Sequence, residues 1–322
     1  MRTLGVVTVS VLALGLGSAL GLGAGCRAPR VEAVRPWSAP HADRFVTPAQ
    51  FRDSLAGAGA VEARLRDLVG ERRGGDASEA GGGGGIVAAV VPHHLVAGHL
   101  VAGLLAYLAD DPPGTVVVVG PDHFRAGPRC GTSAASWLTP AGLLEADAAL
   151  ALALMDGNLA DEAAASHDGE HSVGALMPFI KHYLPGTRVV PVTLRGDATY
   201  LEAVRLGRYL GEWQAQDPGR KLFVLASVDF SHYLPLARAA ENDEATIIAL
   251  RGGHWAALFA MGPGHLDSPG SLAVAFSFAG VEALDEPVFS AVEHTNSALL
   301  LNQPDLPETT SHFLIVIPDG GR

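Results

Sequence analysis

The chain has 322 residues, of which 48% are hydrophobic and 17% charged, so it is long and apolar enough for one large or two small domains. Its formal net charge of −12 and its lack of a basic stripe argue against nucleic acid as a partner. With only two cysteines, the chain cannot form a framework of disulfides.

The first residues have the pattern of an export signal. A charged start precedes an apolar run from Leu4 to Gly25, and small residues lead directly to Cys26. This pattern predicts a bacterial lipoprotein signal over residues 1–26, with Cys26 lipidated, although Gly23 stands where leucine is usual. Ordinary secretion and an uncleaved anchor helix are the alternatives, and the glycines disfavour an anchor helix. We expect residues 27–45 to form a tether, and the protein to be held at the membrane of a bacterial cell envelope by its lipid.

From residue 46 onward, hydrophobic periodicity indicates alternating helices and strands. Residues 71–85 read as a flexible loop, 137–142 as a short hairpin or loop, and Pro191 suggests an edge or kinked strand. This alternation, with no linker after residue 86, predicts one domain over residues 46–322. Its class is α/β, a sandwich with a mainly parallel sheet. The expected helices are 47–68 with Thr47 as N-cap, 97–108, 143–155, 166–183, 200–213, 236–250 and 271–279, and the expected strands are 86–91, 115–119, 188–194, 221–227, 287–293 and 313–317.

Three of these strands carry a histidine within a few residues of their carboxyl end. The run Thr115–Val119 is entirely β-branched, which is typical of a strand buried on both faces. In open α/β sheets, ligands bind outside the carboxyl ends of the strands. Three such histidines at one sheet edge predict a metal site or an acid/base site. The residues that follow the strands are His93 and His94, then His123, then Asp229 and His232.

Four motifs in the same order resemble the Memo-like family, also called AmmeMemoRadiSam system protein B. The resemblance covers roughly residues 86–318. It implies a fold similar to that of the class III extradiol dioxygenases, which hold non-haem Fe(II) between two histidines and a carboxylate. The Memo-like pocket has two histidines and a cysteine instead. The motifs stand here as Pro92-His93, Gly120-Pro121-Asp122-His123, Glu170-His171-Ser172 with Pro178-Phe179, and Ser227-Val228-Asp229-Phe230-Ser231-His232.

The resemblance also implies roles for single residues. It makes His93 and His123 metal ligands and places Asp229 and His232 beside them as the catalytic pair. His232 corresponds to the acid/base histidine of the dioxygenases. The first motif is shorter than usual and carries a second histidine, so His94 remains an alternative ligand to His93.

The cysteine of the family is missing, and its place falls on Asp267 or Ser268. Asp267 would complete a set of two histidines and one carboxylate, which suits Fe(II) and leaves positions open. The neutral hydroxyl of Ser268 would be a poor ligand. Asp267 could instead cap the helix that follows Pro269.

The remaining histidines carry weaker signals. Glu170 and His171 read as a capping arrangement at a helix start, and a functional role for His171 stays open. We expect the others at the surface or in packing, without a role in the site: His41, His99, His182, His254, His265, His294 and His312.

Together these patterns predict an exported Memo-like metal-binding protein with redox or dioxygenase-like chemistry on a small molecule or peptide. The expected cofactor is Fe(II), with Zn(II), Mn(II) or Cu as alternatives. A non-catalytic binding module on the same fold and a metal-dependent hydrolase are the competing hypotheses. The chain has no G-x-S-x-G elbow, no P-loop and no H-E-x-x-H motif.

Overall fold

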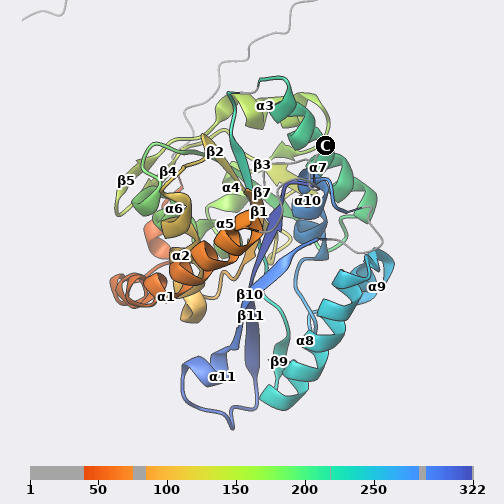
Figure 1. The fold of residues 1–322 in the computed structure, drawn as a ribbon. Helices are drawn as coiled ribbons and strands as arrows, with labels where there is room; N and C mark the ends of the chain where they lie inside the picture. The colour runs from red at the N-terminus through yellow and green to blue at the C-terminus, as the bar shows by residue number, and fades with distance from the viewer. Residues whose placement is uncertain (1–39, 75–84, 218, 283–287, 321–322) are drawn as a thin grey trace, which may run out of the picture. The chain divides into compact units, whose positions relative to one another are not determined.

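The hydrophobic runs of the sequence form the centre of a large mixed sheet (Figure 1). The computed structural model describes residues 40–74, 85–217, 219–282 and 288–320. Within them, eight strands run in the order β10-β11-β1-β8-β2-β7-β3-β6, and β9 pairs with β11. The bounds are β1 (Ile86–Val91), β2 (Thr115–Pro121), β3 (Cys130–Thr132), β6 (Asp161–Glu162), β7 (Arg188–Leu194), β8 (Leu222–Ser227), β9 (His232–Leu234), β10 (Ser290–Asn296) and β11 (Thr309–Pro318).

The four central strands, β1, β8, β2 and β7, are mutually parallel, while β11 and β3 flank them in the antiparallel sense. Their side chains are apolar on both faces, so each face needs a helical cover. Alternate residues therefore enter separate cores: Val117 and Val119 lie in one, Val116 and Val118 in the other. This arrangement confirms the predicted α/β class with a mainly parallel sheet.

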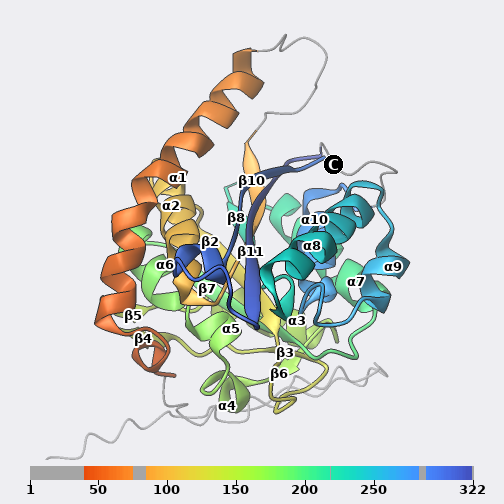
Figure 2. The ribbon, with the colours of Figure 1, turned by 90° about the horizontal axis from the view of Figure 1, so that it is seen from below.

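Helices cover both faces of the sheet (Figure 2). On one side lie α1, α2 and α6, and on the other α7, α8, α9 and α10. A separate two-stranded sheet pairs β4 (Trp137–Thr139) with β5 (Gly142–Leu144), as the predicted hairpin requires. The helices are η1 (Ala42–Arg44), α1 (Pro48–Gly74), η2 (Leu95–Ala97), α2 (Gly98–Leu108), α3 (Ala148–Asp156), α4 (Ala164–His167), α5 (His171–Gly174), α6 (Met177–Tyr183), α7 (Tyr200–Ala215), α8 (Leu236–Arg251), α9 (Trp255–Ala260), α10 (Pro269–Ala279) and α11 (Ser297–Leu300).

Two helix predictions were wrong for local reasons. The helix expected over residues 143–155 starts only after Asp147, which accepts a hydrogen bond from the Leu150 backbone N–H, and the residues before it belong to β5. The helix expected over residues 166–183 is broken into α4, α5 and α6. Glu170 caps a new helix there, and Pro178 can stand only in the first turn of α6.

Two loop and edge predictions also needed correction. The loop expected from residue 71 begins later, because α1 continues to Gly74; residues 75–84 lie outside the described part. The strand with Pro191 lies inside the sheet, between β2 and β3. Proline has no backbone N–H to donate, and it is tolerated here because the pairing of β7 with β3 ends at Val192, one residue after Pro191. The Pro191 carbonyl accepts a hydrogen bond from the Thr132 hydroxyl (2.8 Å).

The signal peptide over 1–26, Cys26 and the tether up to residue 39 lie outside the described residues. From residue 40 the chain packs against the domain. Ala42 is fully buried, and the Leu138 backbone N–H donates to the Pro40 carbonyl (2.9 Å). Among the described helices, none is long and apolar enough to cross a bilayer.

Candidate metal centre

The carboxyl ends of β1, β2 and β8 bring the predicted residues together. His93 follows β1, His123 follows β2, and Asp229 follows β8. Asp267 joins them from the loop before α10, because that loop pairs with the segment after β8. The Asp267 backbone N–H donates to the Asp229 carbonyl (3.1 Å), and Phe230 forms an antiparallel bridge with Leu266.

His93 is buried and held by a hydroxyl. Its Nδ1 lies 3.0 Å from Ser227 Oγ, whose own proton goes to the Ser172 carbonyl (2.5 Å). Ser227 Oγ can therefore only accept from the ring, so Nδ1 carries the hydrogen and Nε2 a lone pair. That Nε2 lies 3.3 Å from Asp267 Oδ2 and 3.4 Å from Asp229 Oδ2.

His123 is held by a carboxylate. Glu170 Oε1 accepts from its Nδ1 (2.9 Å), and Glu170 Oε2 accepts from its backbone N–H (2.8 Å). The same carboxylate caps α5 by accepting from the Ser172 backbone N–H (2.9 Å), so the predicted capping role is present as well. Glu170 therefore fixes a hydrogen on Nδ1 of His123 and turns its Nε2 toward Asp267 Oδ2, 3.7 Å away.

Asp267 brings a carboxylate to both histidines. The Nε2 atoms of His93 and His123 face its Oδ2, which also accepts the Asp229 backbone N–H (3.3 Å), while its Oδ1 is buried without a hydrogen-bond partner among the described residues. Three electron-rich atoms repel one another unless a proton or a cation lies between them. Ligand atoms about 2.1 Å from one ion stand about 3.0 to 3.4 Å apart. The observed separations of 3.3 Å and 3.7 Å are therefore close to those of a coordination sphere.

Burial and neighbouring charges shift the pKa values of His93, His123 and Asp267. Burial lowers the pKa of His93 to about 3, so its ring is neutral at pH 7. Burial also disfavours charge on His123, but the nearby Asp267 carboxylate and the hydrogen bond to Glu170 outweigh this and raise its pKa to about 10. Burial raises the pKa of Asp267 to about 7, with the charge of Asp229 adding to the effect. Without metal, the His123 ring is therefore protonated and its charge faces the Asp267 carboxylate.

His171 offers a second set of donors. Its ring stacks on that of His123 with centroids 4.4 Å apart, and it is 42% exposed. Ring nitrogens of His93, His123 and His171 lie within 4.8 Å of one another, as do the candidate donor atoms of His93, Asp229 and Asp267. Within the described part of the chain, these are the groups of three whose spacing suits a metal.

The site opens into a cavity of about 670 Å³. His232 lines it; its Nδ1 is buried with no partner among the described residues, and burial lowers its pKa, so the ring is neutral near pH 7. Phe124 and Tyr233 are both largely exposed on the walls. The lining consists of Phe45, Gln50, His93, His94, Leu95, His123, Phe124, His171, Ala175, Asp229, His232, Tyr233, Pro263, Asp267 and Thr310.

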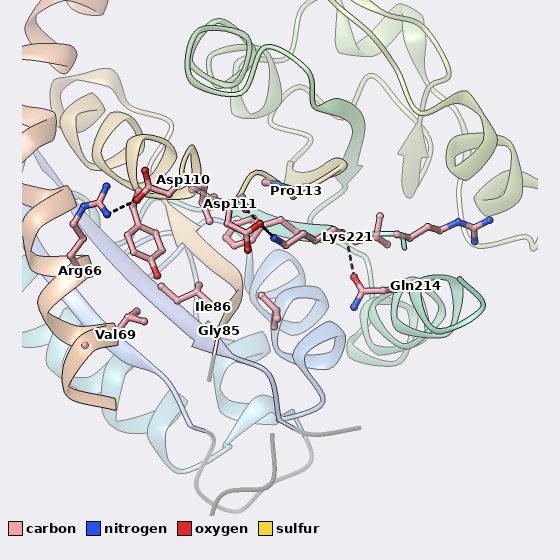
Figure 3. A pocket seen from close by; sticks show the side chains of 16 residues that line it. Arg66, Val69, Gly85, Ile86, Asp110, Asp111, Pro113, Gln214 and Lys221 are labelled. Atoms are coloured by element: carbon pink, nitrogen blue, oxygen red, sulfur yellow. Dashed lines mark hydrogen bonds and ion pairs between the residues drawn. The ribbon is translucent and has the colours of Figure 1, made fainter. Parts of the chain in front are cut away.

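A second cavity, of about 520 Å³, lies at the opposite end of the sheet beside the amino ends of β1 and β8 (Figure 3). Four of its charged side chains form two pairs, Arg66 with Asp110 and Lys221 with Asp111. The fifth, Arg220, pairs with Asp217 outside the cavity. No metal-ligating group of three lies there among the described residues. These pairs connect α1 and the start of β8 to the loop after α2, which is a structural role.

The geometry separates the alternatives that the sequence left open. The Nε2 of His93 faces the carboxylates, whereas His94 is exposed and contributes its backbone N–H to Asp229 Oδ2 (3.1 Å). Ser268, and not Asp267, caps α10; its hydroxyl accepts from the Ser271 backbone N–H and bonds the Ser271 hydroxyl (2.6 Å). Asp267 therefore faces the cavity, where its Oδ2 also accepts the Asp229 backbone N–H (3.3 Å).

Sequence reasoning missed three supporting residues. Ser227 and Glu170 stood inside the recognised motifs, but their hydrogen bonds to His93 and His123 depend on contacts between distant segments. His312 was expected to have no role, yet it is fully buried and donates from Nδ1 to Asp229 Oδ1 (3.0 Å). No pattern in the sequence marks His312.

Comparison with known proteins agrees with the motifs. The family described as Memo-like protein matches residues 76–298, more than half of the chain. Proteins named MEMO1 family protein are 30% identical over 164 residues in Pyrobaculum arsenaticum and 32% over 166 in Methanothermobacter thermautotrophicus. Both matches cover 48% of this chain and 57% of the relative, so the chain spans less than two thirds of these relatives. A solved structure of an uncharacterized protein from Escherichia coli K12 aligns with a TM-score of 0.45 and 13% identity, over 71% of this chain and 99% of that one.

Proposed function

The chain belongs to the Memo-like protein family, and on that premise we propose that it binds a divalent metal ion, Fe(II) foremost, through His93, His123 and Asp267. The observation that carries the proposal is the position of Asp267. Its Oδ2 faces the Nε2 atoms of His93 and His123, and its buried Oδ1 has no partner among the described residues. A metal ion would take the place of the proton on His123 and give the buried Asp267 carboxylate a counter-charge.

The donor types favour Fe(II) among the divalent ions. Two histidines and one carboxylate leave open positions on the ion, and a carboxylate in place of a thiolate shifts preference toward harder metals. Mn(II), Zn(II) and Cu are the competitors, since affinity alone does not select Fe(II). An Fe(II) ion bound there would supply redox and dioxygen chemistry.

The residues around the ion suit chemistry on a small molecule or a peptide side chain. The cavity of about 670 Å³ has room for such a group. His232 lines the cavity as a neutral imidazole and would accept and return a proton as general base and acid. Ser227 and Glu170 would keep the two ligand rings in the tautomer that presents Nε2.

The test is metal content by elemental analysis. The full chain is purified without oxygen, reconstituted with Fe(II), Mn(II) or Zn(II), and compared with His123→Ala and Asp267→Asn. We expect about one ion per chain in the wild type and a large loss in both variants. His94→Ala is the matched control and should retain the ion. A wild-type protein that takes up none of the three metals would refute the proposal.

A second candidate function follows from the position of His171. A site of His93, His123 and His171 would suit Zn(II) and the activation of water for hydrolysis. In that case His171→Ala would lose Zn(II), Asp267→Asn would retain it, and substrate would be hydrolysed without oxygen. A strict requirement for oxygen would exclude this candidate.

We also propose, from residues 1–26 alone, that the protein is exported and anchored by a lipid on Cys26. Metabolic labelling with a tagged fatty acid in a bacterial host should label the wild type and not Cys26→Ser. Equal labelling of both would contradict the proposal.

A further inference from the structure

His312 lies on β11, one of the antiparallel strands beside the parallel centre, and none of its side chain is exposed. Its Nδ1 is 3.0 Å from Asp229 Oδ1, and the Asp229 side chain is only 3% exposed. The other oxygen of that carboxylate, Oδ2, accepts the backbone N–H of His94 (3.1 Å). Two donors from separate segments thus fix both oxygens of one buried carboxylate.

The same contacts leave His312 with an unsatisfied atom. A carboxylate oxygen accepts, so the ring donates through Nδ1 and carries its lone pair on Nε2. This Nε2 is buried and has no partner among the described residues. A buried acceptor without a partner costs folding free energy. An apolar residue would avoid that cost, so packing does not explain a histidine here, whereas its bond to Asp229 does.

Holding Oδ1 determines where Oδ2 points. Asp229 Oδ2 is directed to the lone pair of His93, with Oδ2 and Nε2 3.4 Å apart, and it falls within the 4.8 Å group of His93, Asp229 and Asp267. The orientation of Asp229 therefore decides whether an ion beside His93 meets one carboxylate or two.

We propose that His312 is a positioning residue of the metal centre: it holds Asp229 with one oxygen turned toward His93, and so sets the affinity and coordination of the bound ion. This inference rests on the proposed metal site. Outer partners of this kind typically change metal affinity by about 10- to 100-fold when they are removed.

The first test uses Co(II), whose absorption spectrum reports its coordination, bound to the full chain. His312→Leu removes the donor and should weaken Co(II) binding at least about 10-fold and change the visible spectrum. His312→Asn keeps a side-chain N–H and should restore most of the affinity and the wild-type spectrum. Leu314→Ala, a buried change two residues along β11, is the control for stability; it should lower Tm and leave the spectrum unchanged.

Two outcomes of this test overturn the proposal. One is a folded His312→Leu protein with wild-type affinity and spectrum. The other is His312→Asn behaving like His312→Leu, since that would mean the Nδ1–H bond is not what matters.

A second measurement separates this inference from the proposed function. Nitrogen-15 NMR of the metal-free wild type, with the His312 signal identified by its loss in His312→Asn, reports which ring nitrogen carries the hydrogen. If the wild type binds no Co(II), the metal proposal fails by itself. The Nδ1–H form then still supports the positioning of Asp229 by His312, and the Nε2–H form overturns it.

Discussion

Metal binding should release a proton from His123, and the apparent affinity should therefore rise with pH. The pKa of His123 is raised to about 10, so the metal-free ring is protonated across the physiological range. A metal can bind only the bare Nε2, and the proton must leave. His93, with a pKa lowered to about 3, is already unprotonated and contributes no further proton above about pH 5.

The magnitude follows from the number of protons displaced. One proton released makes the binding constant rise about tenfold per pH unit, or about 1.4 kcal/mol per unit. Below about pH 7 the protonated fraction of Asp267, whose pKa is raised to about 7, adds a second proton. The dependence should therefore steepen toward about a hundredfold per unit in acid.

Two assays check this expectation. Competition of Co(II) between the protein and a chelator, corrected for the chelator's own protonation, gives the slope between pH 6 and pH 9. Calorimetry in two buffers with different ionisation enthalpies counts the protons directly at pH 8. A binding constant that stays flat over this range, with no proton released at pH 8, would refute the assignment of His123 as a ligand.

Three further predictions concern the support of the site and the core. Glu170→Gln removes the charge that orients His123, and metal affinity measured by chelator competition should fall about 10- to 100-fold. Buried His167 has a pKa lowered to about 4 by burial. The unfolded chain therefore binds a proton first as pH falls. The free energy of unfolding should drop by up to about 3 kcal/mol between about pH 6.5 and pH 4, and urea titrations should show less of this drop in His167→Gln. Gly120→Ala would place its Cβ 2.7 Å from the Ser172 hydroxyl oxygen and should lower the free energy of unfolding by about 1 to 3 kcal/mol.

Each of these has a matched control. Glu202 belongs to the capping box at the start of α7 and does not line the cavity, so Glu202→Gln should leave metal affinity unchanged. Equal loss of affinity in both glutamine variants would contradict the role of Glu170. Exposed His182→Gln should keep the wild-type acid profile, and the same flattening there would argue against His167. Gly59→Ala, on α1 with open space around it, should stabilise the protein by up to about 1 kcal/mol. A Gly120→Ala protein as stable as Gly59→Ala would contradict the steric argument.

The centre of the fold could be predicted because its strands are defined by local pattern. The run 86–91 and the run 188–194 form strands with the predicted bounds, since continuous apolar residues suit a buried parallel sheet. The break after Glu170 and the late start after Asp147 could not be predicted in the same way. Their caps are local, but the sequence also fits an uninterrupted helix, and contacts with other segments decide between the two.

Of the site, the sequence could predict the residues that follow the carboxyl ends of the strands. His93 and His123 stand where parallel strands deliver residues to one edge, so their meeting follows from topology. Asp267 was reached only through the resemblance, and the structure brings its Oδ2 to both rings. The contact of His312 with Asp229 could not be predicted, because β11 joins the sheet by an antiparallel pairing that no local residue pattern indicates.

The site is built from segments that lie far apart in the chain, and this determines when it can form. His93 comes from the first strand of the sheet, Asp267 from a loop near the last helices, and His312 from the final strand. Bringing together segments this far apart carries a large loop-closure cost, so such contacts form slowly. An ion bound at this site would therefore meet its ligands only once these segments have packed, unlike zinc in a zinc finger, where ligands lie close together and metal drives folding. Metal loading would be the last step of maturation, and the metals present in the compartment where folding ends would decide which ion is bound.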